Sequence, residues 1–420
     1  MNNILKSNIL NETMHIKTLP SGLCSYIIPK KGFNEKFGAL AVNFGSCDLE
    51  FNLDGKKITT PEGIAHFLEH KVFEDEKLDY FNEFTKLSGS VNAYTNFNTT
   101  VYYFSCTDNF TDCLKLLFDM VYSLYLTDET VEKEKGIIEQ EISMYDDDPS
   151  WRVYFNMLGG LYKNSPVRNE IAGSAASIAK IDQAILRLVF DSFYVPKNMA
   201  LICSGDFELS EVYNIAQEKT ADLTSPKIER IYPEEPSNAP KDSIKDKMHI
   251  SKPLFCLGFK DAHNRTDEKQ IVTTKILLDI IIGGSSETYN KLYKTGLLDD
   301  GFSLDYSHGS CYSTTMFSGT SKDPDTVFEE IINAIKTLKE TGINPLIFER
   351  IKKKHLGRFM QSFNSVSTPS EMQADFFVKG FNIFDLAKAL KDVKIEDVHK
   401  RMENCFTKDN FCISIVDKLE

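Results

Sequence analysis

The chain has 420 residues, of which 42% are hydrophobic, and its 48 Lys and Arg residues against 61 Asp and Glu residues give a net charge of −13. A chain of this length is expected to form more than one domain, and its widely spread apolar residues exclude a wholly disordered protein. The acidic balance argues against nucleic acid as the main partner, because proteins that bind its phosphate backbone usually carry excess positive charge.

The compartment is predicted from features that the sequence lacks. No stretch approaches the about 18 consecutive apolar residues of a transmembrane helix. Residues 1–17 lack the apolar run and the small-residue cleavage site of a secretory signal. The nine cysteines are odd in number, scattered and without a CxxC pair, which favours reduced thiols. We therefore expect a cytoplasmic protein whose partners include neither a membrane nor nucleic acid.

In the first half of the sequence, strands and helices are expected to alternate. β-Branched and aromatic residues predict strands at 36–45, 90–97, 100–106 and 199–205. Segments of helical length and pattern lie at 61–73, 78–87, 109–125, 128–146, 150–162 and 182–194. Two of these helices carry the residues that indicate a chemical function.

The first of these helices carries two histidines and a glutamate in an HxxEH pattern. Thr60 is a good N-cap and Pro61 suits the first turn, so the helix is expected to begin there. At about 100° per residue, His66, Glu69 and His70 share one face. Such imidazoles can bind one zinc ion beside a carboxylate that acts on water, as in metalloproteases. Paired histidines are also common as ordinary surface or core residues, so both interpretations stay open on this motif alone.

The helix predicted at 128–146 carries two glutamates on an apolar face. With Glu134 at zero on a helical wheel of about 100° per residue, Glu141 lies in the same apolar stripe. The stripe consists of Val131, Ile137, Ile138, Ile142, Met144 and Tyr145. Because burying an ionised carboxylate without a partner is costly, a cation would explain both glutamates. Two ordinary ion pairs, or a wheel that slips by one residue, are the alternatives.

A proline-rich, charged stretch at 218–246 is expected to be a linker, because it can sustain neither a helix nor a central strand. Beyond it, strands are predicted at 254–260, 301–307 and 313–319, and helices at 266–282, 286–294, 324–340 and 346–363. The order of elements is similar in the two halves, a weak sign of internal duplication. We predict an α+β protein with domains at 1–217 and 247–420, each a mixed or antiparallel sheet with helices packed on one face.

Several motifs of the first half belong together. HFLEH at 66–70 is followed by SGSVNAYTNFNTTVYYFSC at 88–106 and EKEKGIIEQEI at 132–142. MYDDDP at 144–149 and FYVPKNMALICSGDF at 193–207 come next. This combination resembles the inverzincin metallopeptidases typified by pitrilysin, insulin-degrading enzyme and the mitochondrial processing peptidase. The likeness covers the second half only by general pattern. The length suits the short two-domain bacterial subfamily, whose members pair two such subunits into a closed chamber.

The resemblance implies a role for each polar residue of the two helices. His66, His70 and Glu141 would be the ligands of one zinc ion per chain. Glu69 would be the general base that acts on a water molecule. Glu134 would be a supporting carboxylate that orients a ligand histidine.

The same likeness implies a substrate strand and leaves one ligand open. The spacing from the histidines to the third ligand is slightly short for the family, so Glu139 remains an alternative to Glu141. A peptide substrate would add as a strand at 89–95, with Asn92 and Ala93 nearest the metal, since backbone hydrogen bonds along a sheet edge bind extended peptides. An ordinary core strand is the alternative for this segment.

The second half lacks part of the family's site. The arginine and tyrosine that hold substrate in the family have no counterpart at 283–306, where Tyr293 and either Asp299 or Asp300 stand in their places. We therefore expect a zinc endopeptidase subunit that hydrolyses unfolded peptides or small proteins, with a homologous partner that supplies these two residues. A heterodimer is expected, and a homodimer is left open. A maturation protease for one precursor peptide and a non-catalytic core scaffold subunit are the alternatives.

Overall fold

The computed structural model describes residues 2–261 and 267–419, and these form two compact units. The first unit runs to Ile142 and adds Glu170–Tyr232 and Met360–Phe384. The second contains Ser143–Asn169, Pro233–Phe359 and the chain from Asp385 onward. The chain passes between units after Tyr232, inside the predicted linker, but each unit also takes a segment from the other's predicted range. The domains 1–217 and 247–420, each continuous in sequence, stay a prediction.

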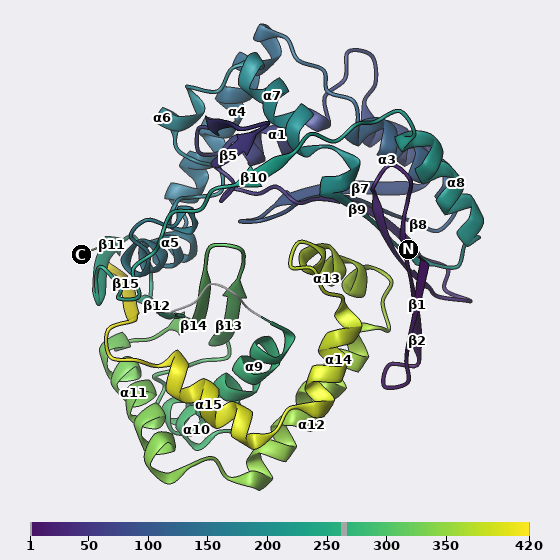
Figure 1. The fold of residues 1–420 in the computed structure, drawn as a ribbon. Helices are drawn as coiled ribbons and strands as arrows, with labels where there is room; N and C mark the ends of the chain where they lie inside the picture. The colour runs from purple at the N-terminus through teal and green to yellow at the C-terminus, as the bar shows by residue number, and fades with distance from the viewer. Residues whose placement is uncertain (1, 262–266, 420) are drawn as a thin grey trace. The chain divides into compact units, whose positions relative to one another are not determined.

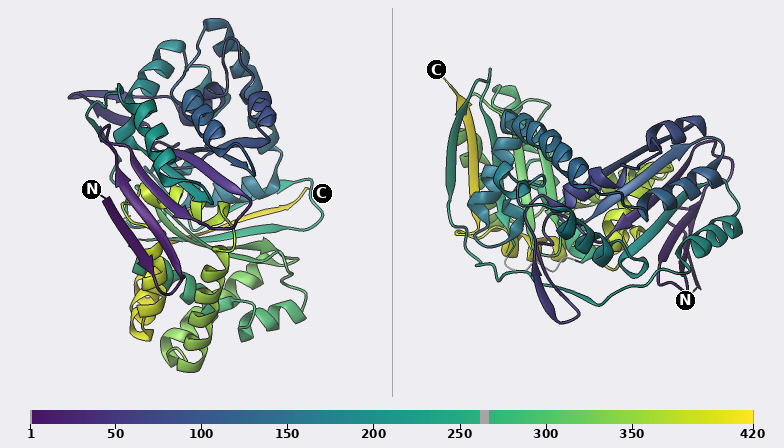
Figure 2. Two further views of the ribbon diagram at one scale, coloured as in Figure 1. Left: turned by 90° about the vertical axis from the view of Figure 1, so that its right-hand side faces the viewer. Right: turned by 90° about the horizontal axis from the view of Figure 1, so that it is seen from above.

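A mixed seven-stranded sheet forms the frame of the first unit (Figure 1). Its strands, in spatial order, are β1 (Asn2–Ser7), β2 (Glu12–Thr18), β3 (Cys24–Pro29), β9 (Met199–Gly205), β4 (Lys36–Val42), β8 (Thr100–Cys106) and β7 (Gly89–Thr95). β3 and β9 pair in parallel, and the other neighbours pair antiparallel. β1 lies at one edge, beside the N-terminus (Figure 2). β7 forms the other edge, so its outer side has no neighbouring strand in this sheet.

The first unit also contains a small sheet and most of the helices near the site. The small sheet consists of β10 (Ile228–Arg230), β5 (Glu50–Leu53) and β6 (Lys56–Thr59). The helices are α1 (Ile64–Val72), α2 (Tyr80–Lys86), α3 (Phe110–Val121), α4 (Asp128–Asp146), α6 (Ala175–Ile178), α7 (Gln183–Phe193), α8 (Leu209–Thr220) and α13 (Ser367–Phe377). The last residues of α4 are counted with the second unit.

Helices cover both faces of the seven-stranded sheet. On one face, Phe37 and Ala39 of β4 and Ile202 of β9 pack against Val366 and Ala374, at the start of α13 and within it. On the other face lie α1 and α3 (Figure 1). The prediction placed helices on one face; α13, from the predicted second domain, adds the second cover because the central strands are apolar on both sides. The α+β fold class itself is confirmed.

The second unit is built on a five-stranded sheet. Its strands, in spatial order, are β11 (Ser243–Met248), β15 (Phe411–Lys418), β12 (Leu254–Lys260), β14 (Ser313–Thr320) and β13 (Ser303–His308). Its helices are α5 (Pro149–Leu161), α9 (Glu268–Ile282), α10 (Glu287–Lys294), α11 (Pro324–Thr341), α12 (Pro345–Ser362), α14 (Ile383–Asp392) and α15 (Ile395–Cys405). Helix α5 packs directly on β12, and Gly258 permits this close approach because a Cβ there would collide with the Met157 side chain.

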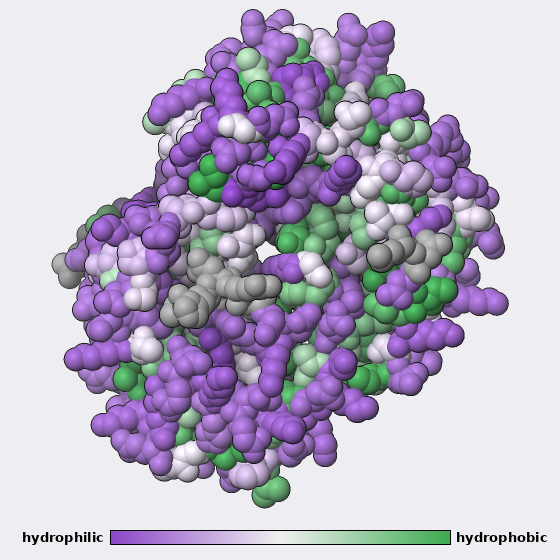
Figure 3. All heavy atoms as spheres, viewed as in Figure 1, coloured by the Kyte–Doolittle hydropathy of each residue, from purple (hydrophilic) through white to green (hydrophobic). Residues whose placement is uncertain are grey.

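The elements predicted in the second half are present with small shifts. The predicted helix at 266–282 is α9, and residue 266 lies outside the described residues. The predicted linker holds β10 and the start of β11, both edge strands, which suits a proline-rich stretch. Within 2–261 and 267–419, no helix combines the length and apolar character needed to cross a bilayer. The face drawn in Figure 3 is mostly hydrophilic, and none of the nine cysteines forms a disulfide bond.

The buried carboxylate of Asp48 binds the segment that ends at Tyr232, where the chain leaves the first unit. Asp48 is 1% exposed and accepts hydrogen bonds from Arg230 Nε at 3.0 Å and from the Tyr232 hydroxyl at 2.6 Å. The Gly45 N–H adds a third bond at 2.9 Å. Three donors therefore offset part of the cost of burying this carboxylate, although burial still raises the pKa of Asp48.

Replacing Asp48 with alanine is expected to lower the free energy of unfolding by about 2–4 kcal/mol, because Arg230, whose side chain is only 19% exposed, loses its carboxylate partner and Tyr232 loses its acceptor. Urea denaturation measures the change. Lys57→Ala is the control, because it breaks an exposed ion pair with Glu50 in the small sheet and should cost about 0–1 kcal/mol. Equal losses in the two variants would show that Asp48 does not hold this part of the fold.

Candidate metal centre

Helix α1 begins later than the sequence predicts. Its first residue is Ile64, and its N-cap is Gly63, whose φ of 87° lies in the left-handed region that favours glycine. Thr60 instead donates its hydroxyl to the Leu49 carbonyl at 3.2 Å and its N–H to the same carbonyl at 2.9 Å. The prediction of Thr60 as N-cap is therefore wrong, because these bonds hold it beside the chain that enters β5.

The stripe on α4 is narrower than the helical wheel predicts. Val131, Ile138 and Ile142 are buried, as expected. Ile137 is 44% exposed and Met144 is 71% exposed, so these two residues were wrongly placed in the stripe. Both lie on the side of the wheel that the buried residues do not occupy. The wheel gives angles between residues, but the packing of the helix decides which part of its surface faces inward.

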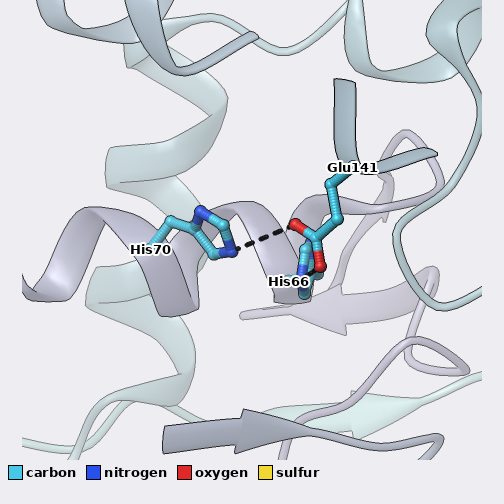
Figure 4. A group of neighbouring side chains, drawn as sticks. All are labelled: His66, His70 and Glu141. Carbon is cyan, nitrogen blue, oxygen red and sulfur yellow. Dashed lines mark ion pairs between the residues drawn. The ribbon is translucent and has the colours of Figure 1, made fainter. Parts of the chain in front are cut away.

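The two histidines of α1 and one glutamate of α4 converge on one point (Figure 4). His66 Nε2 and His70 Nε2 each lie 3.6 Å from an oxygen of Glu141, and the three ligand atoms all lie within 4.8 Å of one another. A separation of 3.6 Å is too long for a good hydrogen bond. It is close to the about 3.4 Å between two ligands that each lie about 2.1 Å from a tetrahedral zinc ion. The three side chains therefore fit a shared metal ion, whereas Glu139 is exposed on α4.

Glu134 holds the second histidine in a defined orientation. Its Oε1 lies 2.8 Å from His70 Nδ1. When the Nδ1–H donates to this carboxylate, the lone pair of Nε2 is left facing Glu141. Burial would by itself lower the pKa of His70, but the hydrogen bond to Glu134 and the nearby carboxylates outweigh it and raise that pKa. The structure thus brings Glu134 to the place expected of an orienting residue.

His66 is held in the neutral form that a metal ion requires. Burial, together with the neighbouring His70, lowers the pKa of His66 to about 4. The two rings are tilted, with centroids 4.5 Å apart. A neutral imidazole offers a lone pair for coordination, whereas a protonated one offers none.

Glu69 lies beside this group and is held by the edge strand of the sheet. Its Oε2 accepts a hydrogen bond from the Thr95 hydroxyl at 2.6 Å. Burial raises the pKa of Glu69, and the bond from Thr95 opposes that rise. A buried carboxylate with a raised pKa is suited to accepting a proton near neutral pH. Thr95 lies at the end of the predicted substrate strand 89–95, but no local pattern connects it to Glu69, because the two residues belong to different elements.

The predicted substrate residues lie on the edge strand. Asn92 is exposed and its side-chain oxygen accepts the N–H of Ala93 at 2.8 Å. Within the β7–β8 pair, Ala93 faces Tyr102 and Thr95 faces Thr100. Since Thr95 contacts Glu69, the same strand that has a free edge also runs beside the HxxEH helix.

The positions expected to hold an arginine and a tyrosine lie in the second unit. Tyr293 belongs to α10 and is 46% exposed. Asp299 pairs with Lys252 Nζ at 2.8 Å and accepts the Thr320 hydroxyl at 2.6 Å. Asp299 therefore serves local pairing in the second unit.

Comparison with known proteins places the chain in a family. Residues 56–175 match the model of "Insulinase (Peptidase family M16)", and residues 180–354 match that of "Peptidase M16 inactive domain". The "Uncharacterized zinc protease YmfH" of Bacillus subtilis is 33% identical over 413 residues, 96% of each chain. A putative M16-like peptidase from Alicyclobacillus acidocaldarius is 34% identical, with a TM-score of 0.95 over 99% of this chain and 100% of that one.

A more distant relative in structure, pitrilysin, shares the fold over about half of its own length. Pitrilysin is 18% identical, with a TM-score of 0.77, and the match covers 99% of this chain but 46% of pitrilysin. This likeness concerns the fold alone, because the identity is low. The two family models and the full-length matches at one-third identity agree with the HxxEH helix, and the chain belongs to peptidase family M16.

Proposed function

We propose that the chain is a zinc-dependent endopeptidase subunit in which His66, His70 and Glu141 hold one zinc ion. The observation that carries the proposal is the convergence of the three side chains: one ligand atom of each lies within 4.8 Å of the others, and each histidine Nε2 lies 3.6 Å from one of the two Glu141 oxygens. Two histidines and a carboxylate are a usual donor set of zinc peptidases. A zinc ion held there would supply Lewis acidity, which makes water nucleophilic near neutral pH and polarises a peptide carbonyl.

The chain's own residues supply the proton transfers and the substrate's position. Glu69 takes a proton from the attacking water and delivers it to the departing amine nitrogen. Glu134 keeps the His70 ring in place through the 2.8 Å bond to Nδ1. An extended peptide pairs with the outer edge of β7 at Asn92 and Ala93. Such pairing recognises the peptide backbone more than its side chains. The substrates are therefore unfolded peptides or small proteins.

A homologous partner subunit completes the site in this proposal. The match to 46% of pitrilysin supports it, because two such chains have about the length of that enzyme. The run 283–306 contains no arginine, and Tyr293 and either Asp299 or Asp300 stand where the resemblance places the arginine and the tyrosine. This also supports a partner, since losing one donor to the developing oxyanion costs about 10²- to 10³-fold in rate. The free cysteines support work in a reducing compartment, the cytoplasm.

Zinc content and peptide hydrolysis test the proposal together. The purified chain is expected to bind one zinc ion, to lose activity with a chelator and to regain it with added zinc. A chain with no bound zinc and no zinc-dependent hydrolysis would favour the scaffold role named above. The same assay, with the chain alone and mixed with a homologous subunit, tests the divided site. If the chain alone is as fast as any mixture, the divided site is wrong.

A further inference from the structure

The side chain of Thr95 donates a hydrogen bond to the carboxylate of Glu69. Its hydroxyl donates to Glu69 Oε2 at 2.6 Å, a short distance typical of a bond to a charged acceptor. Thr95 is the last residue of β7 and Glu69 belongs to α1, so this bond connects the edge strand to the HxxEH helix.

The single hydrogen of the Thr95 hydroxyl has one strong acceptor within reach. The Thr100 oxygen lies 3.3 Å away, on the neighbouring strand. Thr100 donates its own hydrogen to the Phe44 carbonyl at 2.9 Å. The Thr95 hydrogen is therefore directed to the closer, charged oxygen of Glu69.

The side of β8 that carries Thr100 is buried and continues with Tyr102, two residues further along the strand. Tyr194 lies 2.8 Å, oxygen to oxygen, from the hydroxyl of Tyr102, and both side chains are buried. Thr100 is fully buried as well. Neighbours that are fixed by packing and hydrogen bonds leave Thr95 little freedom, and its branched Cβ restricts its χ1 angle further.

We propose that Thr95 is a positioning residue for Glu69, an inference that rests on the proposed function. A carboxylate held at Oε2 cannot rotate freely about its last bond, so the direction of its other oxygen is set before substrate arrives. Thr95 touches neither the histidines nor Glu141 through any of these bonds. Its effect is therefore on the rate of proton transfer, with little effect on zinc binding.

Two substitutions separate the hydroxyl from the shape of the side chain. Thr95→Val keeps the branched shape and the backbone N–H but removes the hydroxyl. It is expected to lower kcat by about 10- to 100-fold, with KM changed less than threefold and one zinc retained. Thr95→Ser restores the hydroxyl and should recover most of the lost rate. Peptide hydrolysis, zinc analysis and thermal unfolding of the full chain measure these quantities.

Thr326→Val is the matched control. Its hydroxyl also donates to a carboxylate at 2.6 Å, that of Asp323, at the exposed start of α11. This variant should retain the wild-type kcat and KM. A Thr95→Val kcat above half of wild type, or a Thr95→Ser variant as slow as Thr95→Val, would overturn the proposal. If Thr95→Val does not fold, Thr95→Ala takes its place beside Thr95→Ser.

A measurement without catalysis separates the inference from the proposed function. A double-mutant cycle of Thr95→Val with Glu69→Ala, followed by urea unfolding, should show non-additive effects because the two side chains share a bond. Additive effects would remove the structural basis of the inference. If the cycle showed this coupling while the wild-type chain showed no zinc-dependent hydrolysis, the proposed function would be refuted. The role of Thr95 in catalysis would be refuted with it.

Discussion

Replacing Glu69 with glutamine is expected to slow peptide hydrolysis by about 10²- to 10⁴-fold while one zinc ion per chain remains bound. An amide has the same size and shape as the carboxylate but cannot accept the proton of the attacking water. The Thr95 hydroxyl can still donate to the amide oxygen, so the side chain stays in place. Glu69 also contributes none of the three converging ligand atoms, so zinc should be retained.

The measurement combines zinc analysis with hydrolysis of an unstructured peptide by the same preparation. Glu83→Gln is the control, because Glu83 belongs to α2 and pairs with Lys86 on the surface. It should retain full activity and zinc. If Glu69→Gln lost zinc together with activity, Glu69 would be a ligand, and its assignment as the general base would be wrong. Unchanged hydrolysis would mean that another group takes the proton.

Replacing Glu141 with glutamine is expected to abolish tight zinc binding, whereas Glu139→Gln should leave it unchanged. Both oxygens of Glu141 take part, each 3.6 Å from a histidine Nε2, and a neutral amide is a poor substitute for this charge. Glu139 lies two residues before Glu141, about 200° around the helix axis, on the exposed side of α4. Two glutamates that differ by two positions thus give opposite results.

Glu134→Gln provides the intermediate case in the same series. In the proposed site, Glu134 bonds His70 Nδ1 and contributes no ligand atom, so its replacement should weaken zinc affinity by about 10- to 100-fold. Competition with a chromophoric chelator measures all three affinities. The expected order of loss is Glu141→Gln, then Glu134→Gln, then Glu139→Gln. A reversal of the Glu141 and Glu139 results would move the third ligand to position 139 and refute the geometry of the site.

Several features of the fold could be predicted from local pattern because they depend on neighbours in sequence. The structure places a strand at 100–106 and a helix at 128–146, as predicted. The strand at 36–42 lies within the predicted range 36–45. Predictions failed where a distant segment competes for the same groups. Thr60 has the right chemistry for an N-cap, but its bonds to Leu49 take it out of the helix.

The sequence by itself placed His66, Glu69 and His70 on one helical face, because positions three and four apart in a helix are neighbours whatever surrounds it. Its motifs were also specific enough to indicate the family. Only the tertiary structure decided that Glu141 reaches the histidines, that Thr95 holds Glu69 and that α13 completes the first unit. Each of these depends on how elements far apart in the chain pack together, and packing is set by the whole core, which no local pattern of residues encodes.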